Sequence, residues 1–332
     1  MSKSSHQKGR IIALLDILQK YTDEEHSLNA AEIIEHLSFK GFDCDRKTVY
    51  DDIETLKDLD YDILLNNIGH KGYFLASREF ELPEVSLLTD AVSAADFISP
   101  SKSEKLIKKL KGLLSSGDAD KLRKNVFLNN SIKCNNEEIY YSIDNIRNAI
   151  LKNKKITLSY VRHNLNNGHF INSTSKEMKV SPYALAWMDD HYYLIANNEK
   201  YNDLMHLRVD RMRSVKINDE DFRHFSEVSD YKDEFNVSDY VQKTFNMFSG
   251  KSIELTLKCN IKFLEQIIDR FGDEIFIRSS DDDRFIFDTK AFESFGLISW
   301  LLSMGDNIEV VSPEHIRKEL LNSAEKIMKL NS

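Results

Sequence analysis

A short stretch past the middle of the chain alternates side chains that suit an anion with side chains that suit a core. It reads His206-Leu207-Arg208-Val209-Asp210. Because successive side chains of a strand point to opposite faces, an imidazole, a guanidinium and a carboxylate would share one face. Three tyrosines lie on the two apolar segments before it, Tyr183, Tyr192 and Tyr193. We predict an anion-binding pocket formed by Tyr183, Tyr193, His206, Arg208 and Arg211.

These residues also have structural interpretations. A strand histidine beside a carboxylate is often a satisfied structural partner, and this alternative applies to His206. Asp210 is expected to orient Arg208 or Arg211 rather than to meet an anion. An arginine next to an aspartate also suits a buried ion pair, so ligand contact and ion pairing both remain open for the two arginines.

The pocket requires strands to hold it. Apolar segments at 180–188, 192–196 and 204–209 are separated by short polar turns, which is typical of a β-meander. A further strand is predicted over 156–162, and the polar, glycine-containing stretch 164–175 is predicted to be a loop. A helix over 139–152 leads into this region.

The block resembles the WYL domain, which is named for a Trp-Tyr-Leu tripeptide. The resemblance rests on Ser181-Pro182-Tyr183, on Tyr192-Tyr193-Leu194 and on Arg208 to Met212. Tyr192 stands where the name expects Trp. The resemblance implies a Sm-like small β-barrel that the predicted strands would build.

The first 80 residues are predicted to form three helices and a hairpin. Apolar spacing indicates a helix over 9–20, Asn29 is a candidate cap for a second helix, and Asp45 is a candidate N-cap for a third. Two apolar segments, 63–65 and 73–75, flank a glycine-containing turn. This order is the plan of a winged helix-turn-helix, whose third helix enters the major groove of DNA.

Several side chains at the start of the third helix can donate to phosphates and base edges. The predicted DNA contacts are Arg46, Lys47, Thr48 and Tyr50, with Lys71 at the wing tip. Lys3, Lys8 and Arg10 are predicted to add a basic N-terminal arm. Against this, Asp51, Asp52 and Glu54 would repel phosphate if they faced it. The sequence from Arg46 to Ile53 resembles the recognition helix of DeoR-like regulators. In those regulators an arginine often stands at the position of Asp51.

The segment 84–125 is predicted to be helical and is the most basic part of the chain. Its cations are Lys102, Lys105, Lys108, Lys109, Lys111, Lys121, Arg123 and Lys124. The plain interpretation is a solvated helical face, and we expect a connector that helps two subunits pair. A contribution to long-range attraction of DNA is the alternative.

The C-terminal part from Ser252 to Val311 predicts the element order β-α-β-β-α-β, with a last helix that begins at Pro313 as its first residue. This is the ferredoxin-like order. It also resembles the C-terminal extension found after many WYL domains. The predicted fold class is therefore α+β multidomain. The expected divisions are 1–80 winged helix-turn-helix, 81–138 helical connector, 139–220 WYL domain, 221–249 linker and 250–332 ferredoxin-like extension.

Composition limits the function classes. The formal net charge of −9 does not favour nucleic acid by itself, so the local charge distribution must decide that point. The three cysteines are far apart and indicate neither a disulfide framework nor a metal site. The chain shows no apolar run of membrane-spanning length and no signal-peptide core, and we expect a cytoplasmic protein that does not enter a membrane.

The sequence favours a DNA-binding transcription regulator, and we expect a homodimer on a two-fold operator. Its effector would be an anion such as a nucleotide or oligonucleotide. One alternative is an accessory factor that holds single-stranded nucleic acid. The weaker alternative is a phosphodiester-processing enzyme, because no known catalytic motif is present. No cofactor is expected.

Overall fold

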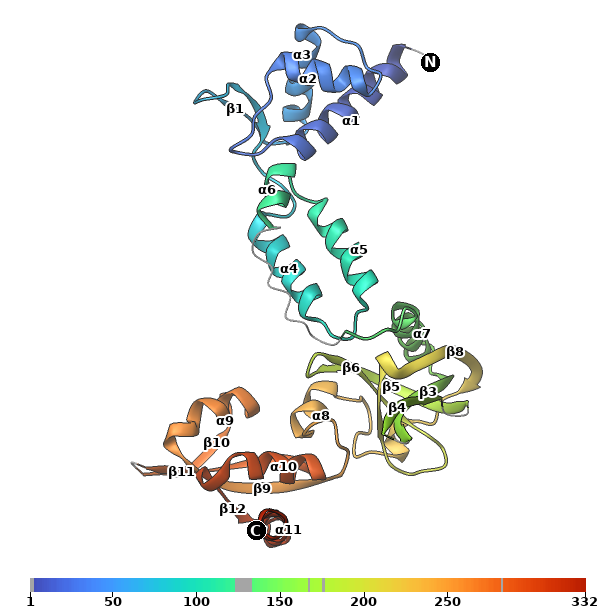
Figure 1. Cartoon of the computed structure of the whole chain (residues 1–332), viewed down its shortest axis with the longest axis vertical. Helices are drawn as coiled ribbons and strands as arrows, with labels where there is room; N and C mark the ends of the chain where they lie inside the picture. Colours follow the sequence, from blue (N-terminus) through green and yellow to red (C-terminus); the bar gives the residue numbers. More distant parts are fainter. Residues whose placement is uncertain (1–2, 123–132, 167, 175–176, 282) are drawn as a thin grey trace. The chain divides into compact units, whose positions relative to one another are not determined.

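The computed structural model describes residues 3–122, 133–166, 168–174, 177–281 and 283–332. The chain divides into two compact units, 1–135 and 136–332 (Figure 1). The first unit contains α1 (Lys3–Tyr21), α2 (Ala30–Phe39), α3 (Arg46–Asp58), β1 (Ile63–Asn66), β2 (Gly72–Leu75), α4 (Leu82–Ala94), α5 (Pro100–Lys111) and α6 (Ser116–Lys121).

The second and third helices begin where their caps predict. The Asn29 side chain accepts from the amides of Ala31 and Glu32, and the Glu32 carboxylate accepts from the Asn29 amide, which completes a capping box. Asp45 accepts from the Thr48 amide at 2.8 Å and starts α3. The three helices enclose one apolar core, which includes Leu14, Ile17, Leu18, Ile33, Leu37, Val49, Ile53 and Leu56.

The predicted basic arm is instead part of α1, which begins at Lys3. Arg10 is not available as an arm residue, because its guanidinium binds Asp52 of α3 through two hydrogen bonds of 2.6 and 3.0 Å. Both side chains are largely buried, with 13% and 4% of their surfaces exposed. Lys8 remains exposed, and the side chain of Lys3 lies outside the described part of the chain.

The antiparallel hairpin β1–β2 is anchored to the chain segment before α2. Leu28 and Tyr73 exchange two backbone hydrogen bonds, of 3.0 and 2.7 Å. Gly72 permits this approach, since a Cβ atom there would lie 2.4 Å from the Leu28 carbonyl carbon.

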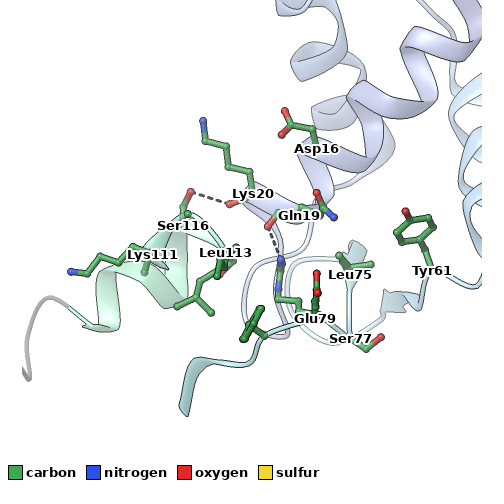
Figure 2. Close-up of a pocket in the computed structure, with 16 residues that line it drawn as sticks. Asp16, Gln19, Lys20, Tyr61, Leu75, Ser77, Glu79, Lys111, Leu113 and Ser116 are labelled. Carbon is green, nitrogen blue, oxygen red and sulfur yellow. Dashed lines mark hydrogen bonds between the residues drawn. The ribbon is translucent and has the colours of Figure 1, made fainter. Parts of the chain in front are cut away.

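A polar joint connects the helices α1–α3 with the connector helices α4–α6. The hydroxyl of Ser115 is fully buried, donates to Asp23 at 2.6 Å and accepts from the Asp118 amide at 3.0 Å. Ser116 donates to the Lys20 carbonyl at 2.9 Å, and Arg78 donates to the Gln19 carbonyl at 2.7 Å (Figure 2). A cavity of about 530 Å³ lies beside this joint.

The predicted lysine-rich face lies on α5 and α6. Lys105, Lys108 and Lys109 are exposed, as a solvated face requires, whereas Lys121 pairs with Glu25 and Asp118. Arg123 and Lys124 fall outside the described residues.

The second unit begins with α7 (Ile139–Leu151) and a six-stranded antiparallel sheet. Its strands are β3 (Lys154–Asn166), β4 (His169–Thr174), β5 (Met178–Met188), β6 (His191–Asn197), β7 (Met205–Arg208) and β8 (Met212–Asp221). A single turn of 3-10 helix, η2 (Val209–Arg211), separates β7 from β8. The stretch predicted as a loop at 164–175 is largely a hairpin of β3 and β4, because Gly168 adopts a positive φ of 78° at its turn.

The strand order is β4-β3-β5-β6-β7, with β8 paired to β3. Among the described residues, no strand pairing joins β7 to β8, so the Sm-like barrel that the resemblance implies is not closed. The meander β5–β6–β7 is present as predicted.

An aromatic segment follows the sheet and contains η3 (Phe225–Glu227) and α8 (Val237–Lys243). It is more than a charged linker, since its rings surround Tyr183. The ring centroids of Phe222, Phe225 and Phe235 lie 5.8, 6.2 and 6.1 Å from that of Tyr183.

The remaining residues form an antiparallel sheet of order β10-β11-β9-β12 with helices. The elements are β9 (Lys251–Asn260), η4 (Ile261–Phe263), α9 (Leu264–Phe271), β10 (Phe276–Ser280), β11 (Arg284–Glu293), α10 (Phe295–Ser303), η5 (Gly305–Asn307), β12 (Ile308–Ser312) and α11 (Glu314–Asn331). The predicted β-α-β-β-α-β order is present. Pro313 precedes the last helix as its N-cap instead of forming its first residue. Among the described helices, none is both long and apolar enough to cross a membrane.

Candidate functional site

The pairing of β6 with β7 brings Tyr193 opposite Arg208. This fulfils the expectation that a neighbouring strand places a phenol beside the guanidinium. The Tyr193 hydroxyl has a raised pKa because of burial, so the phenol stays protonated and is able to donate a hydrogen bond.

Arg208 is already bound on one side. Its Nε donates to Asp210 at 3.1 Å and its second terminal nitrogen donates to the other carboxylate oxygen at 2.8 Å. Burial lowers the pKa of Arg208, but the hydrogen bonds and charge of Asp210 raise it more, so the net pKa lies above the ordinary value. About 24% of the Arg208 side chain is exposed. The guanidinium is therefore a permanently charged, oriented group.

Two neighbours of Arg208 were not predicted. The Nδ1 of His191 lies 3.4 Å from an Arg208 terminal nitrogen, and the Arg208 amide donates to the Tyr160 hydroxyl at 3.1 Å. His191 was detectable, because it stands two residues before Tyr193 and so shares its face of β6. Tyr160 was not, because the pairing of distant strands placed it there.

Arg211 lies on the 3-10 turn after β7 and is half-exposed. Its charge acts on Tyr193 and lowers the phenol pKa, although burial outweighs this effect. Arg211 is thus within electrostatic range of the Tyr193–Arg208 pair.

His206 and Tyr183 do not join this group in the way predicted. The Nδ1 of His206 meets the Met247 carbonyl and its Nε2 lies 2.8 Å from the Tyr240 hydroxyl, so both ring nitrogens have partners. Burial lowers the pKa of His206. Tyr183 is 6% exposed and donates to the Arg223 carbonyl at 2.8 Å. Both residues therefore have a structural role, because the aromatic segment after the sheet covers them and binds their polar atoms.

The opposite face of the same strands carries a different pair. Trp187 and Tyr192 are directly opposite in the β5–β6 ladder, with ring centroids 5.2 Å apart. Half of the Trp187 side chain is exposed. These rings line an open cavity of about 600 Å³ together with Arg147.

In the first unit, the predicted DNA contacts gather at one end of α3 and on the hairpin. Arg46, Lys47 and Tyr50 are exposed, Thr48 is half-buried, and Lys71 is exposed in the turn before β2. The Tyr50 and Tyr73 rings lie 6.2 Å apart, which brings the helix and the hairpin together.

The acidic residues of α3 do not act as one group. Asp52 is buried against Arg10 and cannot face phosphate, whereas Asp51 and Glu54 are exposed. Glu54 pairs with Lys57 at 2.9 Å. The helix therefore presents cations at its N-terminal turn and a partly neutralised surface beyond it.

Two family models match the second unit. The WYL domain matches residues 142–217, and the WCX domain matches residues 251–328. The chain contains a WYL domain followed by a WCX domain. Its WYL domain holds the Tyr193–Arg208 pair, and its WCX domain holds the β9–β12 sheet.

Comparison with solved structures found similar chains at low identity. The proteasome accessory factor B/C (PafBC) of Arthrobacter aurescens shares 17% identity, with a TM-score of 0.26 over 95% of this chain and 47% of that chain. This WYL-domain protein thus spans about half the length of PafBC. A CRISPR Cas-related protein shares 11% identity, with a TM-score of 0.36 over 99% of this chain and 85% of that chain. Comparison with curated proteins gave no match.

Proposed function

We propose that this WYL-domain protein is a DNA-binding transcription regulator that responds to an anionic ligand. The observation that carries the proposal is the exposed Arg46, Lys47 and Tyr50 at the start of α3, beside the β1–β2 hairpin. In this proposal the first 80 residues act as a winged helix-turn-helix, and Lys71 contacts the DNA backbone. Two copies of the chain would bind a two-fold operator as a homodimer.

The ligand would bind beside Arg208, Arg211 and Tyr193. A guanidinium held by Asp210 keeps donors for an anion without losing further side-chain freedom, because its orientation is already fixed. A nucleotide or short oligonucleotide offers the phosphate that such donors suit and a base for the neighbouring phenol. The WYL domain would then favour one placement of the DNA-reading helices. Its role in this proposal is binding rather than catalysis.

A gel shift of the purified chain with its own upstream DNA and a scrambled duplex tests the DNA-binding part. We expect discrete, sequence-dependent binding that is lost in Arg46→Ala/Lys47→Ala. A matched variant, Lys262→Ala/Lys326→Ala, removes two exposed cations from the second unit and should bind as the wild type does. Equal loss in both variants would show that total charge, and not α3, controls binding.

Calorimetry tests the ligand part. Mononucleotides and short oligonucleotides are titrated into the wild type and into Arg208→Ala/Arg211→Ala. Unchanged binding in the double variant would remove these arginines from the site.

A second candidate function is the holding of single-stranded nucleic acid. The pair of half-exposed Trp187 and partly buried Tyr192, with Arg147, favours it, because bases stack on aromatic rings with little sequence preference. Trp187 and Trp300 are the two tryptophans of the chain. Quenching of wild-type fluorescence by an oligonucleotide, absent in Trp187→Leu, would support this function, and quenching that persists in this variant would oppose it.

A further inference from the structure

A cavity of about 760 Å³ lies in the second unit where the WYL domain, the aromatic segment and the WCX domain meet. Its walls come from the residues before β7, from the segment that ends in α8, from the chain entering β9, and from β11. Arg208 and Tyr193 do not line it. The cavity has the size of small-molecule sites, which often form between domains.

The floor of this cavity is apolar and aromatic. Leu204, Val228, Tyr240 and Phe292 are all buried there. The rings of Tyr240 and Phe292 have centroids 4.9 Å apart. Tyr231 adds a half-exposed ring whose centroid lies 6.3 Å from that of Tyr240. A ligand with an aromatic group would replace water on these surfaces at a gain in free energy.

The rim carries charges of both signs. Lys243 and Lys251 contribute two ammonium groups, while Asp203 and Asp230 contribute two carboxylates. The Lys243 ammonium is further neutralised by Asp239 at 2.5 Å. The rim therefore has no excess of positive charge for a phosphate dianion, and its opposite charges suit a ligand that carries one ammonium and one carboxylate.

We propose that this cavity binds a small zwitterion with an aromatic side chain, of the size of a free amino acid. The ligand's carboxylate meets the ammonium of Lys251, its amine meets Asp230, and its ring lies between Tyr231 and Phe292. This proposal is independent of the anion site at Arg208 and does not require DNA binding.

The cavity is connected to the WYL sheet by one hydrogen-bonded chain. Tyr240 forms part of the floor, and its hydroxyl lies 2.8 Å from Nε2 of His206 on β7. His206 stands two residues before Arg208 on the same strand. Because Nδ1 of His206 faces the Met247 carbonyl and must donate to it, Nε2 accepts from Tyr240. A ligand against Tyr240 would thus contact a residue that is hydrogen-bonded to the strand that holds Arg208.

Calorimetry with the full chain tests the proposal through the ligand's own charges. The probes are L-phenylalanine, phenethylamine, which lacks the carboxylate, 3-phenylpropanoate, which lacks the amine, and AMP. We expect L-phenylalanine to bind at least tenfold more tightly than either truncated probe, a difference of about 1.4 kcal/mol. The absence of heat with L-phenylalanine at millimolar concentrations, or tighter binding of 3-phenylpropanoate or AMP, would overturn the proposal.

Two variants place the binding in this cavity. Lys251→Gln and Asp230→Asn should each weaken L-phenylalanine about tenfold, whereas Lys262→Gln and Asp233→Asn should leave it unchanged, since both residues are exposed but do not line the cavity. All four positions are exposed, so loss of folding is not expected, and unchanged tryptophan fluorescence verifies it. L-phenylalanine binding that survives Lys251→Gln and Asp230→Asn lies elsewhere and contradicts the assignment.

Discussion

The Arg10–Asp52 pair offers a quantitative test of how the first unit positions α3. Asp52→Asn removes the charge that neutralises a guanidinium whose side chain is only 13% exposed. Removing one partner of a buried pair typically costs about 3–5 kcal/mol, because the other charge is left without compensation. We expect a loss of this size in the free energy of unfolding of the first unit.

The assay separates the two units by their chromophores. Both tryptophans, Trp187 and Trp300, belong to the second unit, so their fluorescence reports that unit alone, whereas far-ultraviolet circular dichroism reports helices of both. In urea, Asp52→Asn should shift to lower concentration the part of the dichroism transition that the tryptophan fluorescence does not follow.

Two controls make the reasoning refutable. Arg10→Met/Asp52→Leu replaces both charges by apolar groups and should recover most of the loss, since such exchanges are often neutral or stabilising. Lys40→Gln breaks an exposed pair with Asp16 and should cost under about 1 kcal/mol. A dichroism transition in Asp52→Asn that coincides with the wild type, or a double variant as unstable as the single one, would refute the account.

Three further outcomes follow from the structure. Gly72→Ala should destabilise the hairpin by about 1–3 kcal/mol and weaken DNA binding in the gel shift, because its Cβ would overlap the Leu28 carbonyl. For His206, burial lowers the folded pKa below the ordinary histidine value of 6.5. The neutral His206 ring therefore contributes its full stabilisation above pH 6.5. As pH falls below this value, the free energy of unfolding decreases by up to about 1.4 kcal/mol per pH unit. The fluorescence midpoint in urea should drop between pH 7.5 and 5.5 in the wild type, and less in His206→Gln. Ser115→Ala should cost about 1–3 kcal/mol in dichroism-monitored unfolding, because it leaves Asp23 short of a buried donor; an unchanged midpoint would show that water replaces the hydroxyl.

Local signals predicted the parts of the fold that depend on a few neighbouring residues. The caps at Asn29 and Asp45 and the β5–β7 meander follow from short-range hydrogen bonds and from alternation along a strand. The same alternation predicted that a tyrosine of a neighbouring strand could lie beside Arg208. The strand register that makes this tyrosine Tyr193 could not be predicted from the sequence. The WYL resemblance extended the prediction across residues that no single motif covers.

Contacts between residues far apart in the sequence explain why the other features were not predicted. Arg10 looked like a free cation because Asp52, its partner, is 42 residues away. Tyr183 and His206 looked available because the rings and the carbonyl that cover them come from 222–247, a segment that is rich in charge and has little periodicity. The same tertiary packing built the cavity with the mixed-charge rim, which no spacing of residues in the sequence would indicate.

The Ser115 hydroxyl connects two parts of the first unit. The same oxygen donates to Asp23, which follows α1, and accepts from the Asp118 amide as the N-cap of α6. Tilting the connector away from α1 would move the Ser115 hydroxyl away from Asp23 and leave a buried carboxylate short of one donor, while the cap within α6 stays in place. Because Ser116 and Arg78 also donate to carbonyls at the end of α1, a displacement that reaches α6 would be passed to α1, α2 and α3 together. Under the proposed function, it would thereby move the helix that is proposed to contact DNA.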